Sequence, residues 1–302
     1  MTDDRRPTTG DRRPTTDHRR PTTNDQRGTL DADVGRSSFV VGRPQEGRLD
    51  LLLERAGEVT RPRRCLARPP IQLSRVRYDD PQQPGMAAFT LLHLGGVLAG
   101  DRAHLRVELG PGAAARVRMA AATQVYRMPA GDAAHTIELS GGAGARLDWL
   151  AEPLILFGGA RFAQTTRITL DRGARLALLD VLVPGRLARG ERDAFERFES
   201  CLEVYNSAGG CLAAERALLE PRLWRLDQPG LRGDTPVVGS LYLLGDALDA
   251  ERAAAEIHPA GESVTGVTAL PNDCGLLVRA LGDTPSAVRA RLLDIWRMSR
   301  CT

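Results

Sequence analysis

The stretch LGPGAAARV at residues 109–117 has two looser copies, LSGGAGARL at residues 139–147 and LDRGARLAL at residues 170–178. Each copy begins with the leucine that ends one alternating apolar segment, passes through a glycine-alanine turn and enters another such segment. The glycines of the three turns are Gly112, Gly144 and Gly173. Because a spacing of about 30 residues is typical of stacked coils, we predict a mainly β, layered β-helix or solenoid of short strands.

The rest of the chain from Leu49 onward supports this prediction, because apolar and polar residues alternate there as they do in half-buried strands. The segments RAHLRVEL at residues 102–109 and AARVRM at residues 114–119 have this pattern. Further short strands are predicted at residues 51–55, 71–77, 87–94, 136–139, 166–170, 175–182, 200–205, 212–218, 237–244, 263–269 and 275–281.

Two helices are predicted near the C-terminus. The segment GDALDAERAAAEIH at residues 245–258 has Asp246 as a candidate N-cap and an alanine-rich body. In the last segment, DTPSAVRARLLDIWRMSR, Thr284 is the candidate cap and Pro285 falls in the first helical turn. An apolar stripe predicts that this helix packs on a sheet by one side, and its members are Val288, Leu292, Ile295 and Trp296.

The N-terminal segment, residues 1–36, differs from the rest of the chain. It repeats the motif RRPTT from Arg5, Arg12 and Arg19 and contains almost nothing apolar, so we expect a disordered tail. The repeat is interpreted as a tolerated expansion, with a docking arm for an acidic partner as the alternative. Residues 37–302 are predicted to form a single β-helical domain.

Composition argues against several classes of protein. All 41 basic residues are arginines, spread among 38 acidic residues, whereas nucleic-acid binding needs basic residues clustered on one face. We therefore predict no nucleic-acid partner. No apolar run approaches the roughly 18 residues of a membrane span, and no signal peptide is recognised, so a cytoplasmic location without a membrane partner is expected. The five cysteines never form a CxxC pair, which argues against a disulfide framework or a zinc knuckle.

The glycine-rich segment LGGVLAGD at residues 94–101 resembles a phosphate-binding loop only superficially. It contains no lysine, and a strand pattern rather than a helix follows it. We predict a turn in which Gly96 and Gly100 supply positive φ angles and Asp101 hydrogen-bonds the backbone.

The most charged motif is DVLVPGRLARGERDAFERF at residues 180–198. A catalytic interpretation makes Glu191 a general base and Arg186 and Arg189 an anion clamp, but no histidine lies nearby. An exposed loop shaped by its own Arg–Glu pairs, or one that meets a protein partner, ranks above catalysis.

Glu152 precedes the apolar run of residues 153–157. A carboxylate in such surroundings is costly unless it is paired or hydrated. Two interpretations remain open at this point: Glu152 lines a polar channel, or it pairs with Arg161.

Metal-site and nucleophile motifs are sparse as well. The five histidines have no HxH or HxxxH spacing, and no GxSxG motif occurs. We therefore expect no tight metal site and no catalytic residue.

Five blocks in a fixed order do point to a family: GGVLAGD, TQVYRM, EPLILFGGARFAQTT, VLVPGRLARGE and CGLLVRALGDTPSAVRARLLDIWRMSR. Together they resemble the urease accessory protein family UreD, also called UreH, from about Leu49 to Arg300. The resemblance implies a layered β-helix with a pair of helices. It also implies a chaperone that binds UreF, which recruits the GTPase UreG, and docks on apo-urease. Nickel(2+) would pass transiently through an internal tunnel, with no tightly bound cofactor.

On this resemblance we place Glu152, Asp180 and Glu191 near a nickel route, because a moving dication needs oxygen ligands too weak to trap it. Residues of the partner interface, or of structural motifs, are expected to be Arg161, Arg186, Arg189 and Tyr126. Two alternatives belong to other functional classes: a hydrolase that uses Glu191 and a nucleic-acid-binding protein that uses the arginines. No sequence motif supports either of them.

Overall fold

The computed structural model describes residues 44–228, 231–245 and 264–300. These described residues belong to one compact unit. The tail predicted for residues 1–36 lies outside the described residues, as does the helix predicted at 245–258 apart from Gly245. The described part contains no helix with both the length and the apolar character needed to cross a bilayer.

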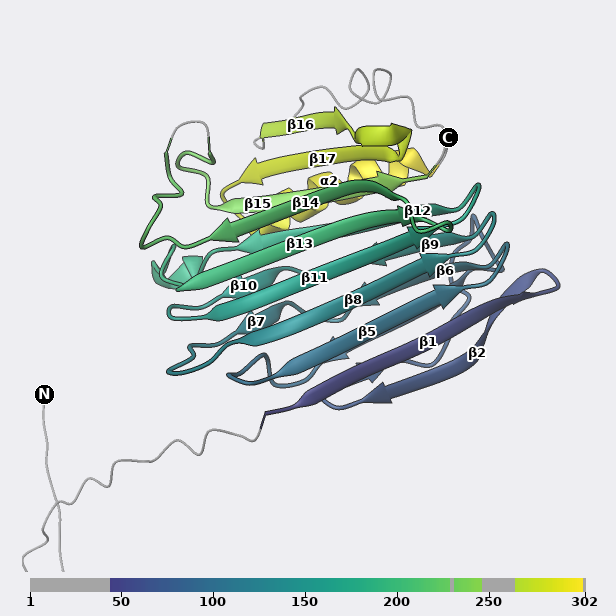
Figure 1. The fold of residues 1–302 in the computed structure, drawn as a ribbon, viewed down its shortest axis with the longest axis horizontal. Coiled ribbons are helices and arrows are strands. Elements are labelled where there is room, and N and C mark those ends of the chain that lie inside the picture. The colour runs from purple at the N-terminus through teal and green to yellow at the C-terminus, as the bar shows by residue number, and fades with distance from the viewer. Residues whose placement is uncertain (1–43, 229–230, 246–263, 301–302) are drawn as a thin grey trace, which may run out of the picture. The chain divides into compact units, whose positions relative to one another are not determined.

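The first of two sheets has seven strands and faces the viewer in Figure 1. In spatial order they are β14 (Cys211–Leu219), β13 (Arg197–Asn206), β11 (Arg161–Leu170), β8 (Ala133–Gly141), β5 (Arg102–Leu109), β1 (Glu46–Ala56) and β2 (Val59–Arg68). The strands from β13 to β1 are parallel, whereas β14 and β2 are antiparallel additions at the two edges.

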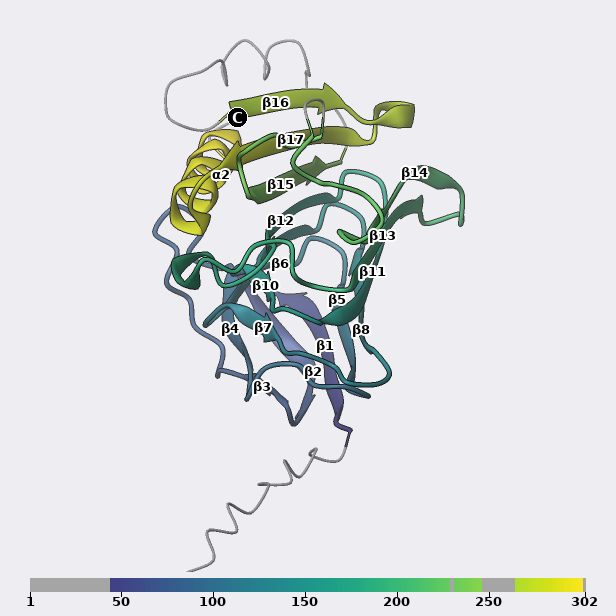
Figure 2. The same ribbon diagram turned by 90° about the vertical axis from the view of Figure 1, so that its left-hand side faces the viewer.

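The second sheet lies behind the first, as the side view shows (Figure 2). Its main path is β16 (Val264–Ala269), β17 (Gly275–Gly282), β15 (Val237–Leu244), β12 (Arg175–Val183), β9 (Arg146–Leu150), β6 (Ala114–Met119), β4 (Ala87–His93) and β3 (Ile71–Leu73). Two three-residue strands, β7 (Thr123–Val125) and β10 (Leu154–Leu156), form a short parallel ladder with the end of β12. The short 3₁₀ helices are η1 (Leu187–Arg189) and η2 (Pro271–Asp273).

The chain coils between these sheets, so the solenoid prediction is confirmed. Successive coils are β5–β6–β7, β8–β9–β10 and β11–β12, and each strand pairs in parallel with its equivalent in the next coil. The glycines of the repeat lie in the turns between the sheets, with φ angles of 64° at Gly112, 66° at Gly144 and 69° at Gly173. Glycine adopts such angles without the steric cost that a Cβ brings, which explains its place in each copy.

Most predicted strands are present, and β9 is the segment that the second repeat copy enters, although the pattern gives no range for it. The strands β2, β7 and β10 have no counterpart in the prediction. The β2 sequence, VTRPRRCLAR, lies at a sheet edge with mostly exposed side chains, so it lacks apolar alternation and tolerates Pro62. The other two strands are too short to show a period. The strand predicted at 71–77 ends at Leu73, and Arg77 then forms an isolated bridge with Ala88.

The C-terminal helix α2 (Pro285–Ser299) covers the outer face of the second sheet over β12, β15 and β17 (Figure 2). The Thr284 side chain accepts a hydrogen bond from the Ala287 N–H, so the predicted cap is present. The predicted apolar stripe is buried, and a Cβ at Gly239 would lie only 2.5 Å from Val288. The absence of a side chain at Gly239 therefore lets the helix approach the sheet closely.

A buried ionic cluster fixes the end of this helix to the sheet. Asp80 accepts hydrogen bonds from Arg116 and Arg300, each at 2.5 Å. Asp148 accepts a hydrogen bond from the Trp296 indole at 3.3 Å, and the Arg116 guanidinium lies over that ring. Because buried charges are costly alone, each member depends on the others.

Candidate functional site

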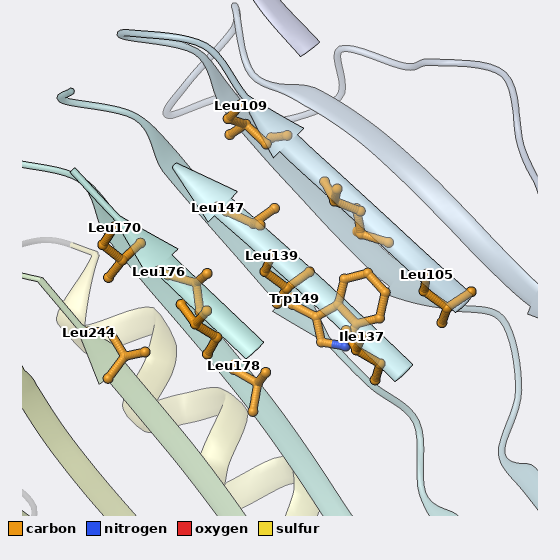
Figure 3. Packing of buried hydrophobic residues seen from close by; sticks show 14 of the residues in the cluster. Leu105, Leu109, Ile137, Leu139, Leu147, Trp149, Leu170, Leu176, Leu178 and Leu244 are labelled. Atoms are coloured by element: carbon orange, nitrogen blue, oxygen red, sulfur yellow. The ribbon is translucent and has the colours of Figure 1, made fainter. Parts of the chain in front are cut away.

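The space between the two sheets is filled with apolar side chains at one end of the strands. In the first sheet, Val107 of β5 pairs with Leu139 of β8, which pairs with Ile168 of β11. Figure 3 shows leucines from both sheets meeting here around Trp149. These side chains are almost completely buried and form the hydrophobic core.

Toward the other end of the same strands this space becomes a cavity of about 510 Å³. In the first sheet the inward row reads Ala103, His135, Gln164 and Ser200, one residue from each of four adjacent strands. In the second sheet Asp180 pairs in register with Ser240, and Ser240 with Arg279. All of these polar residues line the cavity, together with Glu152, Thr123, Glu215 and Tyr242.

Among the residues predicted to lie near a nickel route, Asp180 has a strongly raised pKa. On β12 it follows the inward Leu176 and Leu178 at the same two-residue period, so its carboxyl faces the cavity. Burial raises the pKa of Asp180 to about 6, because the charged form loses solvation. Near neutral pH this carboxylate is therefore an anion held inside the protein.

Glu152 also lines the cavity, at the end of the coil that contains β9. Its Oε1 atom lies 2.6 Å from Nη2 of Arg289 on α2. The alternative pairing with Arg161 is wrong, because Arg161 forms a bidentate pair with Glu196 at 2.8 Å for both contacts. Glu152 is thus paired, with Arg289 rather than Arg161, and it also lines the polar cavity.

A polar bridge joins the sheets across the cavity. Glu215 of β14 pairs with Arg279 of β17 and accepts a hydrogen bond from the Tyr242 hydroxyl at 3.0 Å. Burial, and then the nearby Glu215 carboxylate, raises the pKa of Tyr242 above its usual value. Tyr242 therefore remains a neutral hydrogen-bond donor at any physiological pH.

Glu191 lies in the loop after β12 and is not among the residues that line the cavity. It pairs with Arg186 and accepts backbone hydrogen bonds from Gly158 at 3.1 Å and Arg186 at 3.3 Å. The hydrogen bond from the Arg186 side chain is the main reason that the pKa of Glu191 is lowered. This geometry is that of a loop shaped by its own Arg–Glu pair.

Tyr126 lies near the Arg186–Glu191 pair, with Phe157 between them. The edge of its ring meets Phe157 with centroids 5.1 Å apart, and the Arg186 guanidinium lies 4.8 Å from the Phe157 centroid. Its hydroxyl donates to Gln124 at 2.9 Å. Arg189, at the end of η1, is exposed. The structure thus brings Tyr126, Arg186 and Glu191 together and leaves Arg161 with Glu196.

The segment at residues 94–101 has turn geometry. Gly96 and Gly100 have φ angles of 74° and 87°. A Cβ at Gly96 would lie 2.5 Å from the Tyr126 ring, so glycine also permits close packing there. The two oxygens of the buried Asp101 carboxylate accept the N–H groups of Leu98 and Gln45, each at 2.8 Å.

The sequence analysis did not predict the other polar residues of the cavity, which are Thr123, His135, Gln164, Ser200, Glu215, Ser240, Tyr242 and Arg279. A signal existed for His135, since it has the same strand parity as the buried Ile137 and Leu139. Within the residues that the structure describes, no group of three or more His, Cys, Asp or Glu is arranged to hold a metal ion. The site can thus offer scattered oxygen ligands to a cation along its wall.

Comparison with known proteins identifies the family of the chain. A family model described as "UreD urease accessory protein" matches residues 45–302. A protein of Haloarcula marismortui named "Urease accessory protein UreD" is 35% identical over 264 residues, which cover 86% of this chain and 88% of the relative. "Urease accessory protein UreD 2" of Streptomyces griseus is 35% identical and covers 72% and 76%. "Urease accessory protein UreD" of Cenarchaeum symbiosum is 30% identical and covers 80% and 86%.

Proposed function

The chain belongs to the UreD family of urease accessory proteins, and we propose that it assists urease maturation by binding partners and passing nickel, without a catalytic step of its own. The observation that supports the proposal most is the polar cavity between the sheets. All residues that line this cavity fall within the matched residues 45–302.

The cavity suits transient passage of a divalent ion better than storage. Asp180 and Glu152 place carboxylates on its wall, and Gln164, Ser200 and Ser240 add neutral oxygens. Oxygen ligands spread along a wall hold Ni²⁺ weakly, because tight sites for such ions gather three or four ligands, often imidazole or thiolate, around one point. We therefore propose a nickel route past Asp180 and Glu152, with Glu191 serving to hold the adjoining loop.

The hydrolase alternative has less support from the geometry. A general base works best when its pKa lies near the working pH, whereas the Arg186 hydrogen bond lowers the pKa of Glu191. The oxygens of Glu191 also accept two backbone N–H groups. Glu191 thus has the environment of a structural carboxylate.

We further propose that the partners are UreF, the GTPase UreG and apo-urease, and that one contact surface is the connection between β14 and β15. In this connection Leu223 and Trp224 are 69% and 68% exposed. Leu226 and Arg232 of the same connection line the cavity, and Arg232 pairs with Asp193 of the loop after β12. Exposed aromatic side chains are common anchors of protein interfaces, so a partner bound here would sit beside the cavity.

The test is reconstitution in cells that express apo-urease, UreF and UreG but lack this chain. We expect the chain to co-purify with these proteins and to raise the nickel content and activity of urease. Trp224→Ser should weaken co-purification at least tenfold without changing the melting temperature. Val264→Ser is the matched control, because Val264 is 67% exposed on the edge strand β16. Failure of the wild-type chain to bind any of the three proteins would overturn the proposal.

A further inference from the structure

Two histidines from different sheets lie side by side. His93 ends β4 and His135 lies on β8, and their ring centroids are 5.3 Å apart. Both ring nitrogens of His93 and Nε2 of His135 are buried without a hydrogen-bond partner. They make up three of the six such side-chain atoms in the described part of the chain. Because an unsatisfied buried polar group destabilises the folded protein, three at one place indicate a site suited to a ligand.

Apolar side chains and the backbone of Leu94 lie beside this pair. In the register of the first sheet His135 lies between Ala103 and Gln164. The rings of Phe162 and His135 pack nearly perpendicular to each other, with centroids 4.9 Å apart. His135 also lines the cavity, so the pair lies next to the proposed nickel route.

The protonation state of both rings favours binding of a cation. Burial lowers the pKa of His93, and it lowers the pKa of His135 to about 3. Both imidazoles are therefore neutral at physiological pH and have a free lone pair, which is the form that binds metals. The Asp101 carboxylate is close enough to oppose the fall in the pKa of His93 and would partly balance an added positive charge.

We propose that His93 and His135 together bind one divalent late transition-metal ion, such as Ni²⁺ or Zn²⁺, at the wall of the cavity. Imidazole nitrogen is a preferred ligand of these ions, with metal–nitrogen distances of about 2.0–2.1 Å. Two imidazoles on one tetrahedral ion have ring centroids about 5 Å apart by this geometry, close to the separation observed here. Water or cavity oxygens complete the coordination, so the ion is held but can leave.

The use of this site in urease maturation rests on the proposed function, whereas the binding of metal does not. A titration of the protein with metal alone therefore tests the site. The nickel content of urease tests its use.

The experiment uses the full-length, untagged, metal-free protein with His18→Ala, His104→Ala and His258→Ala, so that the pair are the only imidazoles. His104 is the matched control on the first sheet, since it is half exposed and already paired with Glu138 at 2.9 Å. Ni²⁺ and then Zn²⁺ are titrated in competition with a chromophoric chelator. We expect one ion per chain with an affinity within twofold of that of the wild type. Adding either His93→Gln or His135→Gln should lower it at least tenfold.

X-ray absorption at the nickel edge of the same triple variant keeps the proposal testable if a glutamine variant fails to fold. Two imidazoles per nickel ion are expected. Coordination by oxygen alone, or an unchanged affinity in folded His93→Gln and His135→Gln variants, would overturn the site. A wild-type protein that binds nickel through the pair yet leaves the nickel content of urease unchanged supports the site and overturns the proposed function.

Discussion

The two ends of the space between the sheets are built from the same strands but differ in chemistry. On β8, Leu139 packs in the core, whereas His135, four residues earlier, lines the cavity. On β12, Leu176 and Leu178 pack in the core, and Asp180 follows them at the same period. One end holds the coils together, and the other leaves polar groups around open space. The same strands thus contribute to a packed core at one end and to an open polar space at the other.

The comparison predicts very different costs for truncating side chains at the two ends. Leu139→Ala should lower the free energy of unfolding by about 2–5 kcal/mol, because it removes transfer free energy and leaves a cavity in a packed core. Chemical denaturation of both proteins measures the difference.

Ser200→Ala is the matched change on the inward row of the cavity end. It should cost less than about 1 kcal/mol, because the serine contributes at most a modest hydrogen bond beside open space. Equal losses in the free energy of unfolding for the two substitutions would show that the cavity end is packed as tightly as the core, which would contradict the difference described above.

A second, smaller effect should have the opposite sign. The pKa of Asp180 is raised to about 6 from its ordinary value of 3.8, so the folded protein binds this proton more tightly than the unfolded chain does. The wild type should therefore lose stability as the pH rises from about 4 to about 6 and keep that loss at higher pH. Asp180→Asn removes the titration. We expect it to stabilise the protein by about 1–2 kcal/mol at pH 8, less than full burial would give because the cavity can admit water, and to have little effect at pH 4.

Unfolding curves at pH 4, 6 and 8 for the wild type and Asp180→Asn measure this effect. Glu191→Gln is the control, because the pKa of Glu191 is lowered and its stabilising contribution is instead lost in acid. A constant difference between Asp180→Asn and the wild type at all three pH values would contradict an internal, titrating Asp180.

Much of this architecture could be predicted from local patterns. The turn glycines, the alternation and the stripe on α2 each depend on residues a few positions apart, so the sequence displays them directly. The edge strand β2 could not be predicted in this way, because its exposed arginines do not alternate with apolar residues. The pairing of Glu152 could not be predicted for another reason. Its partner Arg289 is far away in the sequence, on a helix that the fold brings next to Glu152. His93 and His135 meet across two sheets, so no spacing rule reveals them.

The smallest effect on stability is expected for a substitution at Glu152, and this substitution also tests the proposed nickel route. Glu152→Gln keeps the shape of the side chain and removes the charge that would attract a dication. The Glu152–Arg289 pair is partly exposed, with side-chain exposures of 27% and 19%, so its loss should cost no more than about 1 kcal/mol. If the nickel route passes Glu152, urease matured with this variant should contain markedly less nickel while the melting temperature and the co-purification of UreF stay unchanged. Glu191→Gln, outside the cavity lining, should leave the nickel content normal if it keeps its loop folded. Normal nickel content with Glu152→Gln would remove Glu152 from the route, and a loss of stability together with complex assembly would assign it to holding α2 in place.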